Sequence, residues 1–242
     1  MAVSILITRP RPAADDFAAR LRRRLGPEVA IVLSPLMRIV PVQDALPPLD
    51  GMGALIVTSA HAVAALARAP GGCALTCYCV GAATAGAARA AGLKAIEAGG
   101  TAEALIRRVI ADHPPAPLLY ARGEHVARDL AKTLCEAGLE THQAVVYRQL
   151  ADPLSDAARD LLAGPNPVIV PLFSARSARL LLDAAPPRAP LAIAAISENV
   201  ARAVSHAAQV RVAATPDAEA MIDCTEALVS HLNRVESGRT AQ

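Results

Sequence analysis

Small polar residues recur at one kind of position in this chain of 242 residues, where a short apolar run ends and a segment with helical spacing begins. Hydroxyl side chains at such positions cap helices, and the uncapped N–H groups of a helix start attract carboxylates and phosphates. The carboxyl ends of parallel strands meet at one edge of a sheet, so these residues would together bind an anionic ligand. Ordinary capping is the alternative for any one of them. The set comprises Thr8, Thr58, Ser59, Gly81, Ser174, Ser177 and Ser197.

Arginines stand at several similar positions. Arg9 and Arg122 each follow directly after an apolar run, and Arg148 and Arg176 lie near other expected strand ends. A guanidinium group forms bidentate hydrogen bonds with carboxylates, so we expect Arg9 and Arg122 to hold anionic groups of a ligand. Each arginine could equally be a solvated surface charge.

Tyr147 is the tyrosine best suited to chemistry. It ends the apolar run 144–147, beside an expected crossover between lobes. A phenol there could donate a proton or a hydrogen bond to a leaving oxygen. The alternative is a packed, hydrogen-bonded tyrosine. Tyr78 and Tyr120 lie inside apolar runs, and we expect both in the core.

Several common chemistries lack their sequence patterns. The segment 81–86 is bounded by glycines, but it has neither the lysine of a phosphate-binding loop nor the spacing of a dinucleotide-binding motif. There is no Gly-x-Ser-x-Gly motif, and the six histidines have no ligand spacing, so no metal site is expected. A net charge of +2 and an aromatic content of 2% argue against a nucleic-acid partner.

The cysteines and the start of the chain indicate a compartment. Five cysteines without a Cys-x-x-Cys pair, and no secretory signal, predict a cytoplasmic protein with reduced thiols. The uncharged stretch 69–88 is interrupted by proline and glycine, so we expect no membrane span. No feature demands an oligomer, and we expect a monomer.

Short apolar runs alternate with helix-period segments, which predicts an α/β fold with parallel sheets. Pro171 is unusual, because a central strand cannot spare a backbone N–H; it indicates an edge strand, a bulge or another register. The expected strands are 5–8, 29–33, 54–58, 76–80, 95–97, 118–121, 143–147, 168–173, 191–196 and 210–213. The expected helices are 15–25, 60–68, 84–91, 101–112, 125–137, 155–162, 176–184, 199–207 and 217–233.

Part of the sequence occurs twice. A constant spacing over about fifty residues indicates a duplicated structural unit, and hence two similar lobes with a ligand cleft between them. The chain could divide near residue 114, or its first strands could complete the lobe made by its last ones; both remain open. The stretches 34–48 and 148–153 are the best candidates for crossovers. The matching pairs are Ile56 with Leu172, Gly81 with Ser197 and Ala102 with Ala218, each 116 positions apart, and Arg9 with Arg122, 113 apart.

Short motifs follow one another in a specific order and spacing through nearly the whole chain. They are Ile7-Thr8-Arg9-Pro10, Ile56-Val57-Thr58-Ser59-x-x-Ala62-Val63, Val80-Gly81-x-x-Thr84-Ala85, Ala121-Arg122-Gly123-Glu124, Val146-Tyr147-Arg148, Phe173-Ser174-x-x-Ser177-Ala178 and Ala195-Ile196-Ser197-x-x-Val200-Ala201. Each motif is weak alone, but together they resemble uroporphyrinogen-III synthases. One departure is 197–200, where family members often carry Gly-x-x-Thr.

The resemblance implies two flavodoxin-like lobes with parallel sheets, joined by a two-stranded linker, with a cleft between them. The first lobe would be discontinuous and the second continuous, and the polar end of the chain would form a flexible tail. The implied boundaries are 1–36 with 152–234 for the first lobe, 39–147 for the second, 37–38 and 148–151 for the crossovers, and 235–242 for the tail.

The resemblance also implies a reaction, the cyclisation of linear hydroxymethylbilane to uroporphyrinogen III in haem biosynthesis. The substrate would lose its hydroxyl as water, form a spiro intermediate and close with ring D inverted, without a cofactor. Tyr147 matches the proposed general acid of the family. The residues that match cleft-lining positions are Thr58, Ser59, Thr84, Ser174 and Ser177.

The implied partners are the linear tetrapyrrole substrate and, upstream, hydroxymethylbilane synthase. The alternative function is a non-catalytic, two-lobed binding or regulatory protein for an anionic small molecule. Tyr147 distinguishes the two, since a receptor needs no proton donor. A phosphosugar or nucleotide enzyme is disfavoured by the missing phosphate-binding loop.

Overall fold

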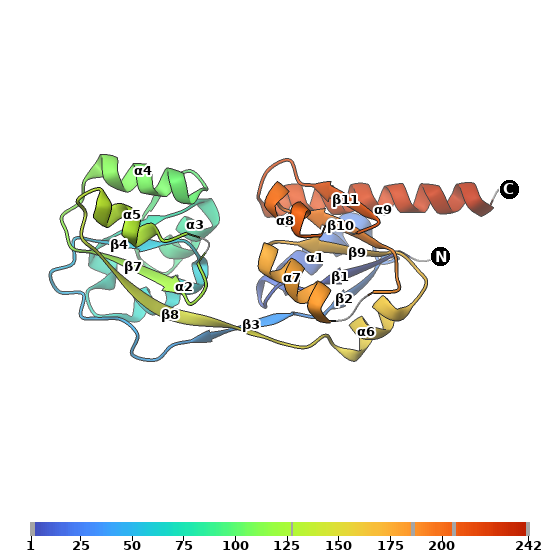
Figure 1. The fold of residues 1–242 in the computed structure, drawn as a ribbon, viewed down its shortest axis with the longest axis horizontal. Coiled ribbons are helices and arrows are strands. Elements are labelled where there is room, and N and C mark those ends of the chain that lie inside the picture. The colour runs from blue at the N-terminus through green and yellow to red at the C-terminus, as the bar shows by residue number, and fades with distance from the viewer. Residues whose placement is uncertain (1–2, 127, 185–186, 205–206, 241–242) are drawn as a thin grey trace. The chain divides into compact units, whose positions relative to one another are not determined.

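The computed structural model describes residues 3–126, 128–184, 187–204 and 207–240. Contacts divide the chain into two units, each with its own sheet. Unit 1 is Met1–Arg38 with Ala151–Gln242, and unit 2 is Ile39–Leu150. Figure 1 shows the elements of both units. The predicted α/β fold with parallel sheets is confirmed.

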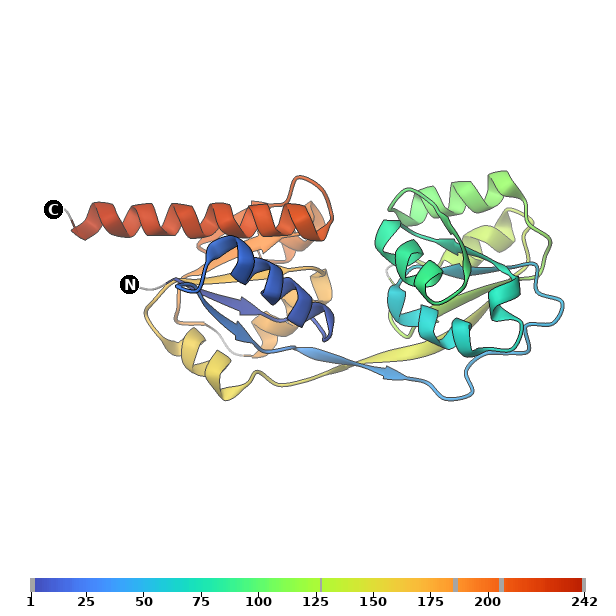
Figure 2. The same ribbon diagram turned by 180° about the vertical axis from the view of Figure 1, so that it is seen from behind.

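Unit 1 contains a five-stranded sheet in the order β11-β10-β9-β1-β2, in which all neighbours are parallel. Helices cover both faces, which explains why its central strands are continuous apolar runs. Helices α1 and α9 pack on the face that carries Ile5 and Ile7, and they lie side by side (Figure 2). Helices α6, α7 and α8 pack on the other face. The bounds are β1 Ser4–Ile7, α1 Ala13–Leu25, β2 Ala30–Leu33, α6 Asp156–Ala163, β9 Val168–Leu172, α7 Ala175–Ala184, β10 Leu191–Ala195, α8 Glu198–Ala203, β11 Gln209–Val212 and α9 Ala218–Thr240.

Unit 2 contains a six-stranded sheet in the order β3-β8-β7-β4-β5-β6, and its pairs from β8 to β6 are parallel. Helices α2 and α3 pack on the face that carries Leu55 and Val57. Helices α4 and α5 pack on the face that carries Ile56 and Tyr120. The bounds are β3 Met37–Pro41, β4 Ala54–Val57, α2 Ala60–Arg68, the 3-10 helix η1 Gly72–Ala74, β5 Thr76–Cys79, α3 Ala82–Ala90, β6 Lys94–Glu97, α4 Ala102–Asp112, β7 Leu118–Gly123, α5 Leu130–Glu136 and β8 Thr141–Ala151.

The strand orders of the two sheets explain the sequence duplication. Strands β9, β10 and β11 of unit 1 correspond to β4, β5 and β6 of unit 2, and β1 and β2 correspond to β7 and β8. The strand order in space is the same, but unit 1 joins the first two strands of the chain to the last three. The first strands therefore complete the sheet made by the last ones, and a division near residue 114 is wrong.

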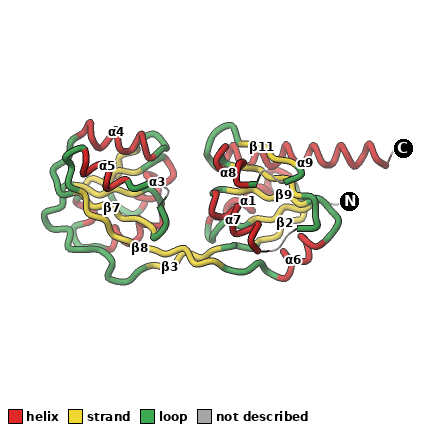
Figure 3. Tube along the Cα trace, viewed as in Figure 1, coloured by secondary structure: helices red, strands yellow, loops and turns green. Residues whose placement is uncertain are grey.

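Strands β3 and β8 differ from the elements expected from the residues. β8 continues to Ala151, past the expected end at 147, and β3 is its neighbour at the edge of the sheet (Figure 3). The resemblance implied two strands here. The residues alone did not predict β3, because it contains a proline and an arginine and has only one fully buried side chain, Met37.

Two helices also differ in their bounds from those expected. Helix α5 begins at Leu130 rather than at 125, because the Asp129 carboxylate accepts a hydrogen bond from Lys132 N at 3.1 Å and caps it there. Residue 127 of that expected helix lies outside the described residues. Helix α8 ends at Ala203, and residues 205–206 of the expected helix 199–207 lie outside the described part.

The predicted tail 235–242 is helical as far as Thr240, while residues 241–242 lie outside the described part. The segment has no proline, and its single glycine does not end α9. Among the helices described, none has the length and apolar composition required to cross a membrane.

Pro171 lies in β9, the central strand of unit 1, so the edge-strand explanation is wrong. In a parallel strand, alternate residues bond to opposite neighbours. Val168 N donates to Pro190 O and Leu172 O accepts from Ile196 N, so the even-numbered residues face the β10 side. The missing N–H of Pro171 therefore faces β1. The register between β1 and β9 ends at Ile5 with Ile169, before the proline.

Candidate functional site

In unit 1 the predicted site residues lie at the carboxyl ends of three adjacent strands, β1, β9 and β10. Thr8 follows β1, Ser174 lies between β9 and α7, and Ser197 follows β10. Because these strands are neighbours and parallel, the sheet brings these residues to one edge, as predicted from the sequence.

Ser174 and Ser177 form a local hydrogen-bonded pair. Ser174 Oγ accepts from Ser177 N at 3.0 Å and lies 2.9 Å from Ser177 Oγ. Ser174 therefore caps α7, and the hydroxyl of Ser177 is buried beside it. Ser197 lies at the corresponding position of α8, but its side chain makes no capping bond.

Arg9 is a partly buried cation. Its guanidinium carbon lies 3.9 Å from the centroid of the Phe173 ring, a cation–π contact. Burial lowers the pKa of Arg9 below its usual value, and attraction to Asp16 opposes this shift. An arginine remains charged after such a change. The stacked group thus supplies positive charge at the end of β1.

Thr8 is 1% exposed, and its Oγ1 has no hydrogen-bond partner among the described residues. A buried hydroxyl left without a partner costs about 1–3 kcal/mol. Such a group in a folded protein calls for an explanation, and one explanation is a bound ligand.

In unit 2 the predicted residues lie in or just after four adjacent strands. Thr58 and Ser59 follow β4, Gly81 follows β5, Arg122 lies in β7, and Tyr147 lies in β8. Ser59 caps α2, since its Oγ accepts from His61 N at 3.3 Å.

Gly81 and Thr84 belong to the start of α3. A Cβ on Gly81 would lie 3.1 Å from Gly100 Cα, so close approach of the two backbones favours glycine there. Thr84 is buried in the first turn of the helix.

The Thr58 hydroxyl is bonded to Tyr120, with 3.0 Å between Thr58 Oγ1 and the phenol oxygen. Burial raises the pKa of Tyr120 above its usual value, while the bond to Thr58 lowers it. Tyr120 is in the core, as predicted, but its link to the strand-end residues was not. The available signal was the position of Tyr120. It lies two residues before Arg122, in the strand next to the one that Thr58 follows.

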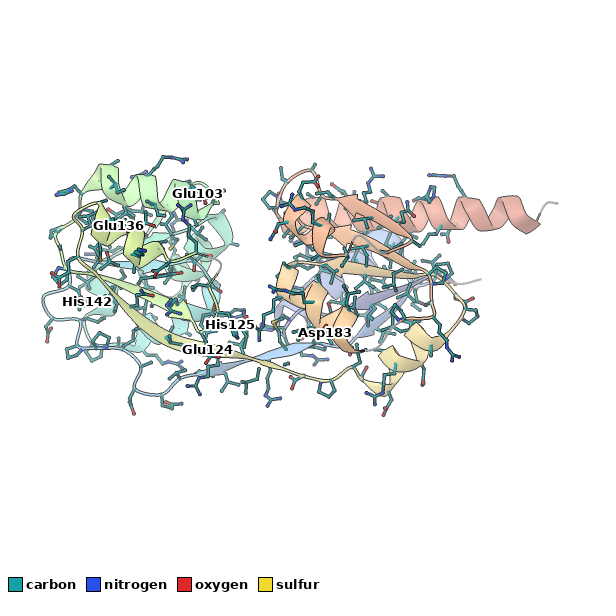
Figure 4. All side chains as sticks on the ribbon, in the orientation of Figure 1. Glu103, Glu124, His125, Glu136, His142 and Asp183 are labelled. Atoms are coloured by element: carbon teal, nitrogen blue, oxygen red, sulfur yellow. The ribbon has the colours of Figure 1, made fainter. Side chains whose placement is uncertain are left out.

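Arg122 is engaged within its own unit. Its Nε donates to Gln143 Oε1 at 2.7 Å, and one terminal nitrogen donates to Gly123 O at 2.9 Å and Glu124 O at 3.2 Å. Glu124 also lies 3.6 Å from Arg148 and 3.9 Å from His125; Figure 4 labels Glu124 and His125. These contacts order the chain beyond β7.

Tyr147 is 7% exposed and belongs to the core between the sheet and α2. Its ring packs against the backbone of Gly123, and the His61 ring meets it edge-on with 5.6 Å between centroids. His61 has no motif of its own, and sequence reasoning missed it. The signal was its place in the first turn of α2, two residues after Ser59.

Two cavities lie away from the predicted site residues. One of about 830 Å³ in unit 2 is lined by residues 41–50, the end of α2 and Val146. One of about 330 Å³ in unit 1 is lined by the end of α7, by β10 with the residues before it, and by Val204, Ala207 and Ala208. Neither is lined by a predicted site residue. Within the described ranges, no three His, Cys, Asp or Glu side chains are grouped to hold a metal ion.

The fold and these residues define a class: α/β proteins of two similar parallel-sheet units, one discontinuous in sequence, with hydroxyl and arginine side chains at the strand ends. A family model described as uroporphyrinogen-III synthase HemD matches residues 15–223. The chain belongs to the uroporphyrinogen-III synthase family. A comparison with the curated proteins finds no match.

Two solved structures share the fold. The uroporphyrinogen-III synthetase of Helicobacter pylori is 18% identical, with a TM-score of 0.69, over 94% of this chain and 100% of that one. A mutant uroporphyrinogen III synthase of the extremely thermophilic bacterium Thermus thermophilus is 20% identical, with a TM-score of 0.60, over 95% and 100%. The family consists of lyases that cyclise hydroxymethylbilane in haem biosynthesis, which confirms the predicted function and does not favour a non-catalytic binding protein.

Proposed function

We propose that this protein performs the family's cyclisation with the strand-end residues described above. The observation that carries the proposal is their position at the carboxyl ends of adjacent parallel strands in each unit. There, helix starts and arginine side chains can receive the acetate and propionate groups of a linear tetrapyrrole. The proposed binding residues are Thr8, Arg9, Ser174, Ser177 and Ser197 in unit 1 and Thr58, Ser59, Gly81, Thr84 and Arg122 in unit 2.

Tyr147 is the proposed catalytic residue. Its phenol donates a hydrogen bond or proton to the hydroxyl of the substrate, and this hydroxyl departs as water. The pyrrole of the same ring gives up its N–H proton, to the phenolate or to solvent, and becomes an azafulvene. The substituted carbon of ring D attacks, a spiro-pyrrolenine forms, and its breakdown and reclosure give uroporphyrinogen III. Holding the two ends of the substrate together supplies the proximity that ring closure requires.

The isomer of the product tests the activity. Hydroxymethylbilane is generated in situ, the protein is added, and the oxidised porphyrins are separated. We expect isomer III, whereas isomer I alone is the product of spontaneous closure and would exclude the enzymatic function.

Tyr147→Phe tests the proton donor in the same assay. We expect turnover to fall while binding of the product changes little. Tyr78→Phe is the matched control, since Tyr78 is also buried in unit 2 but packs on the opposite face of the sheet, with α4 and α5. Normal turnover in Tyr147→Phe would remove Tyr147 from the mechanism.

We also propose a monomer that works in the cytoplasm and receives its substrate from hydroxymethylbilane synthase. The support is chemical: the free cysteines suit a reducing compartment, and hydroxymethylbilane closes spontaneously if transfer is slow. Sedimentation of the purified protein, alone and with the upstream enzyme, measures both associations. A stable dimer would contradict the monomer.

A further inference from the structure

We propose that Gly123 and His61 are positioning residues for the reaction, because they fix where the Tyr147 phenol lies. Neither touches the reacting atoms in this proposal; both act through the tyrosine. The inference rests on the proposed function to the extent that Tyr147 must be the donor.

The backbone brings Gly123 and Tyr147 opposite each other. Strands β7 and β8 pair in register as far as Arg122 with Val145, and then Gly123 pairs with Tyr147. This irregularity adds one residue, Val146, to β8, as in a β-bulge. Glu124 N donates to Tyr147 O at 3.1 Å and holds the shifted register.

The missing side chain of Gly123 leaves the space that the phenol occupies. A Cβ at this position would lie 2.6 Å from Tyr147 Cζ, 2.7 Å from Cε2 and 2.8 Å from the phenol oxygen. Ordinary contacts between carbon atoms are about 3.5–4.0 Å, so even a methyl group would displace the ring. The atoms that would move are those at the hydroxyl end of the ring.

His61 provides the second contact with the ring. Its imidazole lies 5.6 Å from the Tyr147 ring, at an interplanar angle of 63°. The Ser59 cap fixes the backbone of His61 at the start of α2. The phenol is therefore located by two elements, the β7–β8 bulge and the first turn of α2.

A displaced donor lowers turnover more than binding. A misplacement of about 1 Å can lower the rate about 100-fold. We expect Gly123→Ala to lower kcat by about 10- to 100-fold with little change in KM. In a Tyr147→Phe background, Gly123→Ala should have almost no further effect on kcat, because the group it displaces is already absent.

Two other glycines of unit 2 provide matched controls. A Cβ on Gly86 would meet nothing within 4 Å, so Gly86→Ala should leave kcat unchanged. A Cβ on Gly53 would lie 1.6 Å from Pro115 O, so Gly53→Ala should lower stability without an effect on Tyr147. The two controls thus separate an effect of general destabilisation on kcat from an effect of displacing the phenol.

The Tyr147 ring can be observed by NMR, because the chain has only three tyrosines and no tryptophan. In protein labelled with 3-fluorotyrosine, fluorine NMR gives three resonances, which Tyr→Phe variants assign. Gly123→Ala should shift the Tyr147 resonance, and Gly53→Ala and Gly86→Ala should not. Should Gly123→Ala fail to fold, His61→Leu carries the test, with the same expected shift and loss of kcat, and His61→Phe should recover most of that loss.

The outcomes distinguish the proposal that Tyr147 is the proton donor from the proposal that Gly123 and His61 position it. If Tyr147→Phe keeps normal turnover, both the proposed donor and this inference are wrong. If Tyr147→Phe loses turnover but Gly123→Ala and His61→Leu keep normal kcat or an unshifted resonance, only the positioning is wrong. An equal loss from Gly123→Ala in the Tyr147→Phe background would also overturn it.

Discussion

Arg9 and Arg122 occupy equivalent places in the duplicated sequence, but their side chains are engaged differently. Arg9 stacks on Phe173 through the face of its guanidinium group, a contact that does not use its N–H donors. Arg122 already donates to Gln143 and to two backbone carbonyls. Equivalent positions therefore do not imply equal contributions to the binding of a polyanion.

We predict that Arg9→Gln raises KM by about 10-fold with kcat nearly unchanged, because it removes one charge-assisted contact made throughout the reaction. Arg122→Gln should raise KM less and lower stability instead. Steady-state kinetics with both variants measure the difference. A larger rise in KM for Arg122→Gln would contradict this assignment.

Tyr120 links stability to pH. Burial raises the pKa of its phenol in the folded state, so the folded protein binds this proton more tightly than the unfolded chain does. The corresponding stability is present below the unfolded pKa of about 10, and it is lost as pH rises through the folded value. Burial also raises the pKa of Tyr78, which acts in the same direction.

We predict that Tyr120→Phe lowers the free energy of unfolding by about 1 kcal/mol at neutral pH, since the bond to Thr58 is lost. Above about pH 10 the variant should lose stability with pH less steeply than the unaltered protein. Urea unfolding at a series of pH values measures both effects. Parallel pH profiles would show that Tyr120 does not titrate as described.

At the scale of elements, β9 shows how a central strand accommodates a proline. The nitrogen of Pro171 faces β1, where the register has already ended at Ile169. A residue with an N–H at this buried position would need an acceptor on β1 beyond the paired residues Ile5 and Ile169.

We predict that Pro171→Ala lowers the free energy of unfolding by about 1–3 kcal/mol, because it buries an unpaired N–H. Pro190→Ala, at an exposed position beside the same sheet, is the control and should change stability little. Denaturant unfolding of both variants provides the comparison. A gain in stability for Pro171→Ala would mean that the new N–H finds an acceptor.

Most elements follow from local patterns, and the differences have local causes. Strands such as β1 and β4 are apolar runs between turn residues, so the sequence alone predicts them. The start of α5 depends on one cap, Asp129, and β3 depends on its pairing with β8. Helical spacing or apolar character does not reveal either feature.

The candidate site also has features that the sequence predicts and features that it does not. Residues that follow a strand directly, such as Thr8 and Ser174, could be predicted, because parallel strands bring their carboxyl ends together. The contacts of Tyr147 could not, since they depend on the register shift that places it opposite Gly123. One residue more or less in that bulge would turn the ring to the other face of the sheet.

At the scale of the whole molecule, the two units have the same strand order, but they differ in whether they are continuous in sequence. Unit 2 is one segment, whereas the sheet of unit 1 needs β1 between β9 and β2. All four residues of β1 are buried, so unit 1 without them would lose the centre of its core.

We predict that residues 39–150 fold alone with a cooperative urea transition, and that residues 151–242 do not. Circular dichroism and NMR spectra of the two segments measure this. Addition of residues 1–38 in trans should restore structure to the second segment. Cooperative folding of 151–242 alone would contradict the importance given to β1.

The same connectivity has a consequence for the nascent chain. β1 leaves the ribosome long before β9, its neighbour, which begins only at Val168. At about 5–20 residues per second, translation of the roughly 160 intervening residues takes roughly 8–30 s, and meanwhile the apolar Ile5, Leu6 and Ile7 have no β9 to pack against. Unit 2 is complete within that interval. We therefore expect β1 to be a chaperone-binding segment during synthesis.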